Sequence, residues 1–333
     1  MKIIITGGLG FIGSNIVNFL NTKGITDILI VDNFNINQKF YNILGCQYKD
    51  LINITDFETG IINNNFKEYD IIIHQGACSD TMEEDGEYVF KNNYTYSKKI
   101  LDFCLVNDIR MIYASSAAVY GNSKNFKEII ENEKPINIYG FSKLCFDNYV
   151  RQKLLSSHPQ VAGLRYFNVY GPKEEFKGRM SSIVFQLFNE QKQNNKMSLF
   201  GTTKNYNAGN QSRDFVYIDD ILNYNWFLIN NPKVSGVFNA GTGISNTFID
   251  IANSIFNALI KNKYYDKDNI ILTKKPKINF IKFPDKLIGK YQEFTKADID
   301  SLRKLGFDYE FLPISESVKK YVDYLVLKNE TNI

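Results

Sequence analysis

Residues 1–13 read MKIIITGGLGFIG. The β-branched run Ile3-Ile4-Ile5 is typical of a buried strand, and the glycines behind it end that strand. Further on, Ile12, Ile16 and Leu20 recur every four residues, which is the spacing of one helix face. The order strand, glycine turn, helix predicts the first unit of a parallel α/β sheet.

The same alternation continues along the first half of the chain. Residues 28–31, 71–73 and 111–114 are continuous apolar runs, as parallel strands covered on both faces require. Between them, the side chains of residues 94, 97, 101 and 104 share one helical face, and residues 139–154 carry helical periodicity. We therefore expect a doubly wound Rossmann sheet joined to a smaller α/β domain that binds the substrate.

The length of 333 residues is more than one compact core usually fills, so about two domains are expected. We assign residues 1–170 with 214–242 to a dinucleotide-binding Rossmann domain. Residues 171–213 with 243–333 form the predicted substrate-binding domain.

Beyond residue 170 the composition changes. Residues 173–179 are charged and contain glycine, and residues 192–210 are rich in Asn, Lys and Gly, so we expect loops in both stretches. Residues 261–277, rich in lysine and asparagine, are interpreted as a solvated excursion.

Composition and charge exclude several classes of function. The net charge of +3 arises from 39 basic and 36 acidic residues, a balance that argues against nucleic acid or an anionic membrane as a partner. No apolar run approaches the roughly 20 residues of a membrane span. Four scattered cysteines and two histidines give no metal-ligand spacing, so no metal site is expected, and we interpret the cysteines as reduced in the cytoplasm.

The glycine turn predicts a dinucleotide site. Gly7, Gly10 and Gly13 lie three residues apart at a strand-to-helix junction, so the backbone, together with Phe11 and Ile12, can approach a pyrophosphate at the helix N-terminus.

Two side chains after the second strand bear on the choice of cofactor. Asp32 ends that strand about twenty residues after the turn, where a carboxylate can accept hydrogen bonds from the adenosine ribose of a nicotinamide cofactor. Asp32 would repel a ribose 2′-phosphate, whereas Lys39 in the next loop would neutralise it, so NADP and NAD both remain open.

A second motif predicts acid/base chemistry. Tyr139 and Lys143 are four residues apart and hence on one helix face. A neighbouring lysine and a positive nicotinamide ring would lower the pKa of the phenol towards neutrality. Ser116 follows a predicted strand, where its hydroxyl can hydrogen-bond a substrate oxygen.

Together these motifs resemble the extended short-chain dehydrogenase/reductase family of NAD-dependent epimerases and dehydratases. Within that family the sequence is similar, nearly end to end, to the branch acting on ADP-activated manno-heptoses. The stretches that carry the similarity are Thr6 to Asn15, His74 to Ser79, Asn92 to Tyr94, Ala114 to Ala118, Arg165 to Pro172, Arg213 to Tyr217 and Phe283 to Leu287.

The resemblance implies an epimerase that inverts C6 of an ADP-heptose through a 6-keto intermediate, with NADP reduced and reoxidised in each turnover. It implies Tyr139 and Lys177 as two acid/base groups, Lys143 on the nicotinamide ribose and Ser116 at the reacting oxygen. Two bases have a physical rationale, because the hydroxyls of the two epimers lie in different places relative to the nicotinamide. Lys177 must then be partly desolvated to lose its proton near neutral pH.

The resemblance also implies binding residues. Those around the cofactor, besides the residues already named, are Asn33, Gln75, Gly76, Ala77, Cys78, Ser79, Asn92 and Val169. Those around the sugar nucleotide, besides Ser116, are Asn168, Arg179, Gln186, Phe200, Gly201, Thr202, Arg213 and Tyr291. The resemblance further suggests a homo-oligomer, commonly a pentamer.

Three positions depart from the family pattern. Arg179 stands where a serine is usual, Gln186 where a histidine is usual, and Ile54 where a lysine near the cofactor phosphate is usual. The first two bear on substrate contacts and the third on NADP.

Two other functions share part of this pattern. A UDP-hexose 4-epimerase with bound NAD would use the same glycine turn, Ser116, Tyr139 and Lys143. A non-catalytic protein that senses the cofactor would keep the glycine turn without needing those three side chains. A 4,6-dehydratase is disfavoured because Ser116 is followed by Ala117-Ala118, where elimination of water needs an acid and a base.

Overall fold

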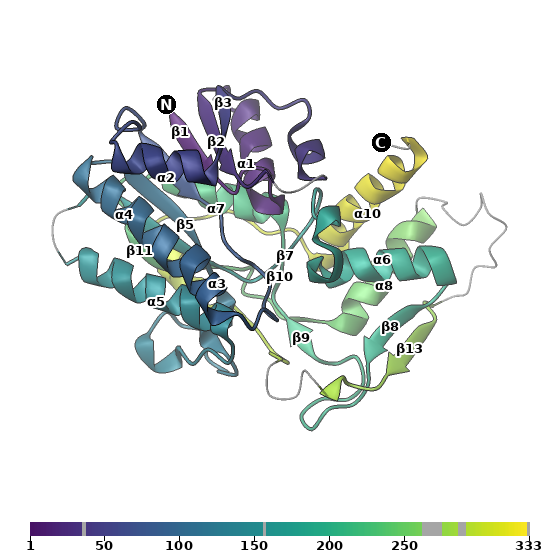
Figure 1. Ribbon diagram of the computed structural model, residues 1–333. Helices are drawn as coiled ribbons and strands as arrows, with labels where there is room; N and C mark the ends of the chain where they lie inside the picture. Colours follow the sequence, from purple (N-terminus) through teal and green to yellow (C-terminus); the bar gives the residue numbers. More distant parts are fainter. Residues whose placement is uncertain (35–37, 156–157, 262–274, 286–290, 332–333) are drawn as a thin grey trace.

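The computed structural model describes residues 1–34, 38–155, 158–261, 275–285 and 291–331. Its central sheet has seven parallel strands in the order β11-β6-β5-β4-β1-β2-β3 (Figure 1). They are β1 (Ile3–Thr6), β2 (Ile28–Asp32), β3 (Asp50–Asn53), β4 (Ile71–His74), β5 (Arg110–Ser116), β6 (Val161–Tyr166) and β11 (Gly236–Ala240). The order reverses direction at β1, so the predicted doubly wound Rossmann sheet is confirmed.

Helices cover both faces of this sheet, because alternate side chains of each strand point to opposite sides. Ile3 and Ile5 of β1 join the core beneath α1 (Phe11–Thr22) and α7 (Ile218–Asn230). Ile4 joins the other core, beneath α2 (Ile54–Ile62), α4 (Tyr96–Val106) and α5 (Ile138–Lys153). The four predicted strands and the first helix are therefore where their apolar runs indicated.

Three strands of the sheet, β3, β6 and β11, had no such run to predict them. β3 is an edge strand with only two apolar residues. β6 is fully buried but contains Gly163 and Arg165. Gly163 leaves room for a neighbour, since a Cβ there would lie 2.5 Å from the Tyr113 hydroxyl oxygen. Arg165 is neutralised by Asp147 and Glu133 at 2.9 and 2.6 Å. Tertiary contacts thus override the local pattern in β6.

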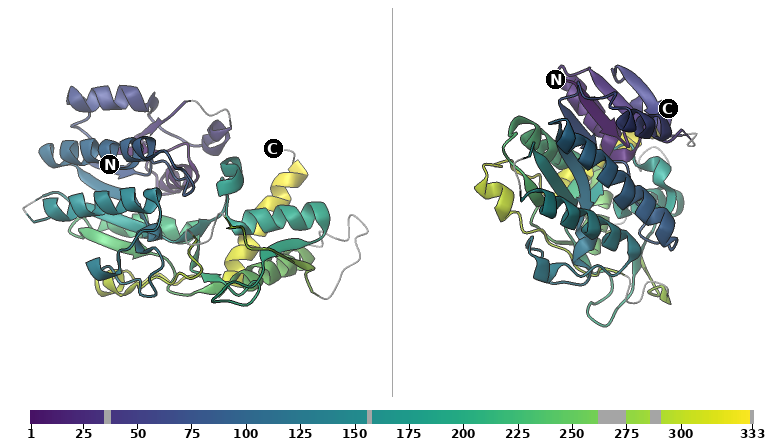
Figure 2. Two further views of the ribbon diagram at one scale, coloured as in Figure 1. Left: turned by 60° about the horizontal axis from the view of Figure 1, so that its bottom comes forward. Right: turned by 60° about the vertical axis from the view of Figure 1, so that its left-hand side comes forward.

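A second group of elements lies beside the sheet (Figures 1 and 2). It contains α6 (Ile183–Asn194), β8 (Met197–Phe200), α8 (Phe248–Lys261), β13 (Ile278–Ile281) and α10 (Ile314–Thr331). Short pairs join the groups: β7 (Asn168–Tyr170) with β10 (Phe215–Tyr217), and β9 (Ser212–Arg213) with β12 (Asn246–Thr247). The remaining elements are η1 (Lys39–Ile43), α3 (Gly86–Phe90), η2 (Lys91–Thr95), η3 (Ala117–Tyr120), η4 (Ile130–Asn132), η5 (Glu175–Met180) and α9 (Asp300–Lys304).

The expectation of loops over residues 192–210 was wrong in part. α6 continues to Asn194, and β8 occupies residues 197–200. β8 forms because Met197 and Leu199 are buried and because its backbone pairs with β13, some eighty residues away. Residues 173–179 lack a strand or α-helix but include most of the short 3-10 turn η5.

Two further expectations remain predictions. Most of the stretch 261–277, namely residues 262–274, lies outside the described residues. The division of the chain at residues 170, 213 and 242 is not tested by the arrangement of elements alone. No helix in the described ranges is both long and apolar enough to cross a lipid bilayer.

Candidate active site

A cavity of about 840 Å³ opens where the strands of the sheet end and the second group of elements begins. One wall consists of the glycine turn and the carboxyl ends of β2, β4 and β5. The other consists of η5, α6 and β8. In doubly wound folds, ligands bind at this carboxyl edge, beside the point where strand order reverses.

The glycine turn forms one end of the cavity. Gly7 adopts a φ of +67° and donates its N–H to Val31 O at 2.7 Å, so the turn is folded tightly against β2. A Cβ at Gly13 would lie 2.2 Å from Gly7 O, which only glycine avoids. Gly10 caps α1 without a side-chain hydrogen bond, and the first N–H groups of a helix have no partner within it. The turn therefore fits a pyrophosphate, since nothing from its own cap blocks those donors.

Asp32 and Lys39 lie next to the turn. The buried Asp32 carboxylate accepts from the N–H groups of Leu9 at 2.9 Å and Asn33 at 2.7 Å. The Lys39 amine is 3.4 Å from the same carboxylate and 5.7 Å from the centre of the Phe176 ring. Both side chains line the cavity. They therefore offer a ribose one acceptor and one cation at the same point.

Tyr139, Ser116 and Lys143 lie together at the end of β5. Asn137 accepts from Gly140 N at 2.7 Å and so begins α5 just before Tyr139. The Ser116 side chain lies close enough to the Tyr139 phenol to lower its pKa. The Lys143 amine, 4% exposed, donates to Ala114 O at 2.9 Å. The helical spacing and the strand end thus bring the three predicted groups into one cavity wall.

The electrostatics of Tyr139 differ from the expectation. In the protein alone its pKa is raised above the usual value, chiefly by burial, and the hydrogen bond from Ser116 opposes that rise. Burial lowers the pKa of Lys143 to about 8. The Lys143 amine donates to Ala114 O, and its charge is not among the causes that shift the pKa of Tyr139 in the protein alone.

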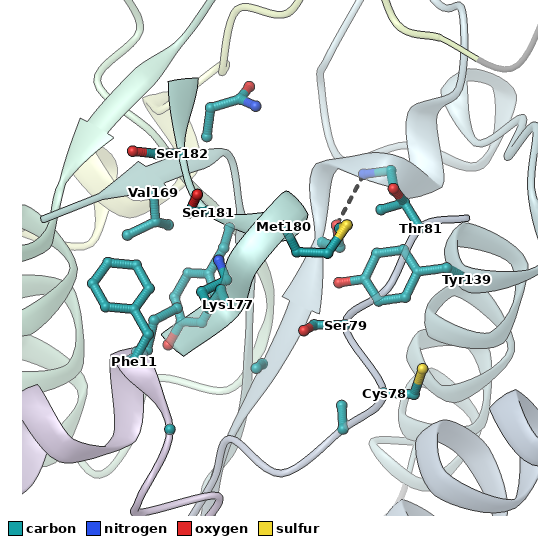
Figure 3. Close-up of a pocket in the computed structure, with 18 of the residues that line it drawn as sticks. Phe11, Cys78, Ser79, Thr81, Tyr139, Val169, Lys177, Met180, Ser181 and Ser182 are labelled. Carbon is teal, nitrogen blue, oxygen red and sulfur yellow. Dashed lines mark hydrogen bonds between the residues drawn. The ribbon is translucent and has the colours of Figure 1, made fainter. Parts of the chain in front are cut away.

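Lys177 enters the cavity from the opposite wall. Figure 3 shows Lys177 on η5 and Tyr139 on α5 both pointing inward, with Met180 and Ser79 near them. The Lys177 amine is 5.2 Å from the centre of the Phe11 ring. Burial lowers its pKa, and the charge of Glu174 acts in the other direction. The partial desolvation required of a second base is therefore present.

Two side chains that depart from the family pattern lie at the same wall. Arg179 Nη2 is 2.6 Å from Asp80 Oδ2 across the cavity. Gln186 donates to Ser181 O at 2.8 Å and to Arg179 O at 3.4 Å. Arg179 is thus paired with Asp80 on the sheet side of the cavity, while Gln186 bonds the backbone of residues 179 and 181 on its own side.

The far end of the cavity is aromatic. The rings of Phe200, Phe283 and Tyr291 meet edge to face, with centroids 5.1 to 5.8 Å apart. The Arg213 guanidinium lies over Tyr291 at 4.4 Å and donates to Gln292 O at 2.7 Å. In the described part of the chain, the buried Arg213 Nε has no hydrogen-bond partner. A flat base and an anionic group are the ligands that suit such a set.

Most of the predicted site residues line this one cavity. On the cofactor side they are Gly7, Gly10, Phe11, Ile12, Gly13, Asp32, Asn33, Lys39, Gln75, Gly76, Ala77, Cys78, Ser79, Asn92, Lys143, Val169 and Lys177. On the substrate side they are Ser116, Tyr139, Asn168, Arg179, Gln186, Phe200, Arg213 and Tyr291. Gly201 and Thr202 do not line it, because the chain turns away after β8: Gly201 N bonds Ile281 O at 2.8 Å, and Thr202 is exposed.

One residue beside the cavity was not singled out by the sequence, although it lies in the predicted stretch Asn92 to Tyr94. Asn93, rather than its neighbour Asn92, is buried and bonds both backbone groups of Cys78, at 2.8 and 3.0 Å. Asn93 lies in the π-turn η2, whose extra residue rotates it inward. Periodicity in the string Asn92-Asn93-Tyr94 does not distinguish the two amides. Among the residues described, no group of three His, Cys, Asp or Glu side chains is placed to hold a metal ion.

Comparison with known proteins places this geometry in context. Residues 3–241 match the model of the NAD dependent epimerase/dehydratase family. The chain is 47% identical over 330 residues, 97% of both chains, to the ADP-L-glycero-D-manno-heptose-6-epimerase of Brachyspira hyodysenteriae.

Solved structures show the same architecture. The crystal structure of the Helicobacter pylori ADP-L-glycero-D-manno-heptose-6-epimerase has a TM-score of 0.78 at 31% identity, covering 98% of this chain and 96% of that one. A UDP-N-acetylglucosamine 4-epimerase from Methanobrevibacter ruminantium has a TM-score of 0.80 at 24% identity, with 98% of each chain covered. The latter likeness concerns the fold alone.

Proposed function

The chain belongs to the NAD-dependent epimerase/dehydratase family, and we propose that it converts ADP-D-glycero-β-D-manno-heptose to ADP-L-glycero-β-D-manno-heptose by inverting C6. The observation that carries the proposal is the entry of Tyr139 and Lys177 into one cavity from opposite walls. The near full-length relative of that name supports the choice of sugar nucleotide.

Two proton-transfer groups suit this reaction. The C6 hydroxyl projects in different directions in the two epimers, so one fixed side chain does not reach both protons. Tyr139, with Ser116 beside its hydroxyl, transfers the proton of the C6 hydroxyl in one epimer. Lys177, whose pKa is lowered by burial, transfers that proton in the other epimer. Between the two transfers C6 is a ketone, and the substrate side chain reorients.

The cofactor residues follow from the turn. A nicotinamide dinucleotide, when bound, accepts a hydride from a carbinol carbon and returns it. The N-terminus of α1 would hold its pyrophosphate, Asp32 its adenosine ribose and Lys143 its second ribose. We propose NADP, because Lys39 supplies a cation beside Asp32.

The sugar nucleotide occupies the remaining space in this proposal. The aromatic end formed by Phe200 and Tyr291 takes the base, and Arg213 takes the diphosphate with its Nε, which has no hydrogen-bond partner among the described residues. Asn168, Arg179 and Gln186 lie towards the heptose. We further propose that the protein acts in the cytoplasm and that it forms a homo-oligomer. Light scattering of the purified protein measures the oligomeric state.

The test begins with the purified protein as it is isolated. Mass spectrometry of the denatured sample identifies the released cofactor, and NADP is expected. The protein is then incubated separately with ADP-D-glycero-β-D-manno-heptose and with UDP-galactose, and epimerisation is followed by NMR. Conversion of the heptose is expected; faster turnover of the UDP-hexose would favour a 4-epimerase, and no turnover of either would favour a cofactor-sensing protein.

A further inference from the structure

We propose that Glu174 is a positioning residue for Lys177, tying together the two ends of the segment 171–182 that carries the lysine into the cavity. The inference rests on the proposed function, since Lys177 acts only within it. It concerns a buried carboxylate to which the acid/base scheme assigns no role.

The contacts of Glu174 close the segment at its base. The side chain has no exposed surface. Its Oε1 accepts from Gly171 N at 3.3 Å and from Ser182 Oγ at 2.7 Å, and its Oε2 accepts from Ser182 N at 2.5 Å. One carboxylate therefore spans both ends of a twelve-residue segment, and a buried charged acceptor of this kind forms strong hydrogen bonds.

The interior of the segment is shaped by its own short bonds. Lys177 N donates to Glu174 O at 3.0 Å, so η5 starts from the same residue that closes the base. Gly178, with a φ of +54°, turns the chain, and its carbonyl accepts from Ser181 N at 3.1 Å. The position of the Lys177 amine thus follows from where Glu174 holds Gly171 and Ser182.

Charge gives Glu174 a second effect on Lys177. Among the described residues, the Glu174 carboxylate is the charged group that shifts the pKa of Lys177, and it raises that pKa against the effect of burial. From α1 the amine faces the uncharged ring of Phe11. From α10, Tyr321 faces the carboxylate, and burial followed by the charge of Glu174 raises the pKa of that phenol.

The neighbouring Glu175 provides a matched control. It carries the same charge one residue further along, but its Oε1 pairs with Lys328 of α10 at 3.1 Å. It neither closes the base of the segment nor lines the cavity among the residues described. Glu175→Gln therefore removes one negative charge from the same segment without loosening its ends.

The experiment compares wild type with Glu174→Gln, Glu174→Asp and Glu175→Gln. Wild type is assayed first on ADP-D-glycero-β-D-manno-heptose: absence of turnover there would defeat the proposed function rather than the role of Glu174. For active protein, kcat is measured against pH. Competitive acetylation of lysines, read by peptide mass spectrometry, gives the pKa of Lys177 without reference to activity.

Glu174→Gln is expected to lower kcat at least about tenfold, because the loosened segment misplaces the amine. It is also expected to lower the pKa of Lys177 by on the order of one unit, because the nearby negative charge is gone. Glu174→Asp keeps the charge but shortens the reach, so kcat falls while the pKa of Lys177 stays. Glu175→Gln should resemble wild type.

A Glu174→Gln protein with the kcat and Lys177 pKa of Glu175→Gln would overturn the proposal. So would a fall in kcat with an unchanged pKa of Lys177, since that pattern reflects a role in folding alone. If Glu174→Gln does not fold, Ser182→Ala removes one of the three bonds and leaves the charge. It should lower kcat and leave the pKa of Lys177 in place; an unchanged kcat would refute the positioning role.

Discussion

Arg179 of η5 and Asp80 of the segment after β4 form an ion pair of 2.6 Å that joins the two walls of the cavity. The two residues are 99 positions apart in the chain. The Arg179 side chain is 73% exposed, so water and salt screen the pair and its effect on stability is small. We instead expect the ion pair to affect the binding of the ligand that lies between the two walls.

Arg179→Ala is expected to raise KM for the sugar nucleotide several-fold, because the walls lose the contact that holds them around it. The melting temperature should stay within about 2 °C. Steady-state kinetics at low and high salt measure the effect, and Asp80→Asn should reproduce it without adding to it. Lys320→Ala, which breaks an exposed 2.8 Å pair with Asp219, is the control; an equal rise in KM there would contradict the prediction.

Tyr139→Phe should lower kcat by about 10²- to 10⁴-fold, since it removes the hydroxyl that we propose transfers a proton and leaves the ring in place. Cofactor content, measured by mass spectrometry, should not change. Tyr149→Phe provides the control on the same helix. The Tyr149 hydroxyl lies outside the cavity and donates to Asp102 Oδ1 at 2.6 Å. A Tyr139→Phe enzyme close to the wild-type rate would refute the acid/base role.

The buried His74 is expected to make the folded protein less stable in acid. Its ring bonds the hydroxyls of Thr6 and Ser97 at 2.6 and 2.8 Å, and burial, reinforced by the charge of Lys143, lowers its pKa to about 3. Between pH 6.5 and pH 3 the unfolded chain therefore binds a proton that the folded chain does not. Stability falls as the pH falls through this window, by about 2 kcal/mol between pH 7 and pH 5.

Urea unfolding at pH 7 and pH 5 measures this effect. In His74→Gln the amide can still donate and accept but does not titrate, so that share of the loss should vanish. His158→Gln replaces the only other histidine and should leave the loss intact. Equal pH dependence in wild type and His74→Gln would show that other groups cause it.

Lys39→Ala tests the proposed preference for NADP. Without the amine, the Asp32 carboxylate faces the ribose alone, and its charge repels a 2′-phosphate. NADP binding should weaken about tenfold or more while NAD binding changes little. Titration calorimetry on cofactor-stripped protein gives the dissociation constants of NADP and NAD. Lys49→Ala is the control, because Lys49 pairs with Asp27 at the surface. Equal weakening for the two cofactors would count against a phosphate contact.

The sheet was largely predictable from local patterns. Ile3-Ile4-Ile5 and the three similar runs became β1, β2, β4 and β5, because strands buried on both faces need apolar side chains at successive positions. β8 was missed because only two of its four residues are buried and its partner β13 is distant in the chain. The orientation of Asn93 was missed because a π-turn shifts the helical phase.

The site divides in the same way. The glycine spacing and the Tyr139–Lys143 spacing indicated the chemistry, since each depends on neighbours within a turn or two. The spacing predicted that Lys143 lowers the pKa of Tyr139, but in the protein alone that pKa is raised and Lys143 is not among its causes. The Lys143 amine instead bonds Ala114 O, on a strand 29 residues earlier. The roles of the individual side chains remain predictions until the variants above are measured.

The amino-acid order alone determined β1, β2, β4, β5 and the first helix, and which residue types could do chemistry, because periodicity and turn preferences act between near neighbours. Only the tertiary structure decided which of those residues face each other. It placed Lys177 opposite Tyr139, joined Arg179 to Asp80 and closed the segment of Lys177 with Glu174. The Arg179–Asp80 pair depends on how whole elements pack, and a contact between residues 99 positions apart leaves no periodic trace in the chain. The bonds of Glu174 are local, but they depend on the fold of a loop that has no regular period.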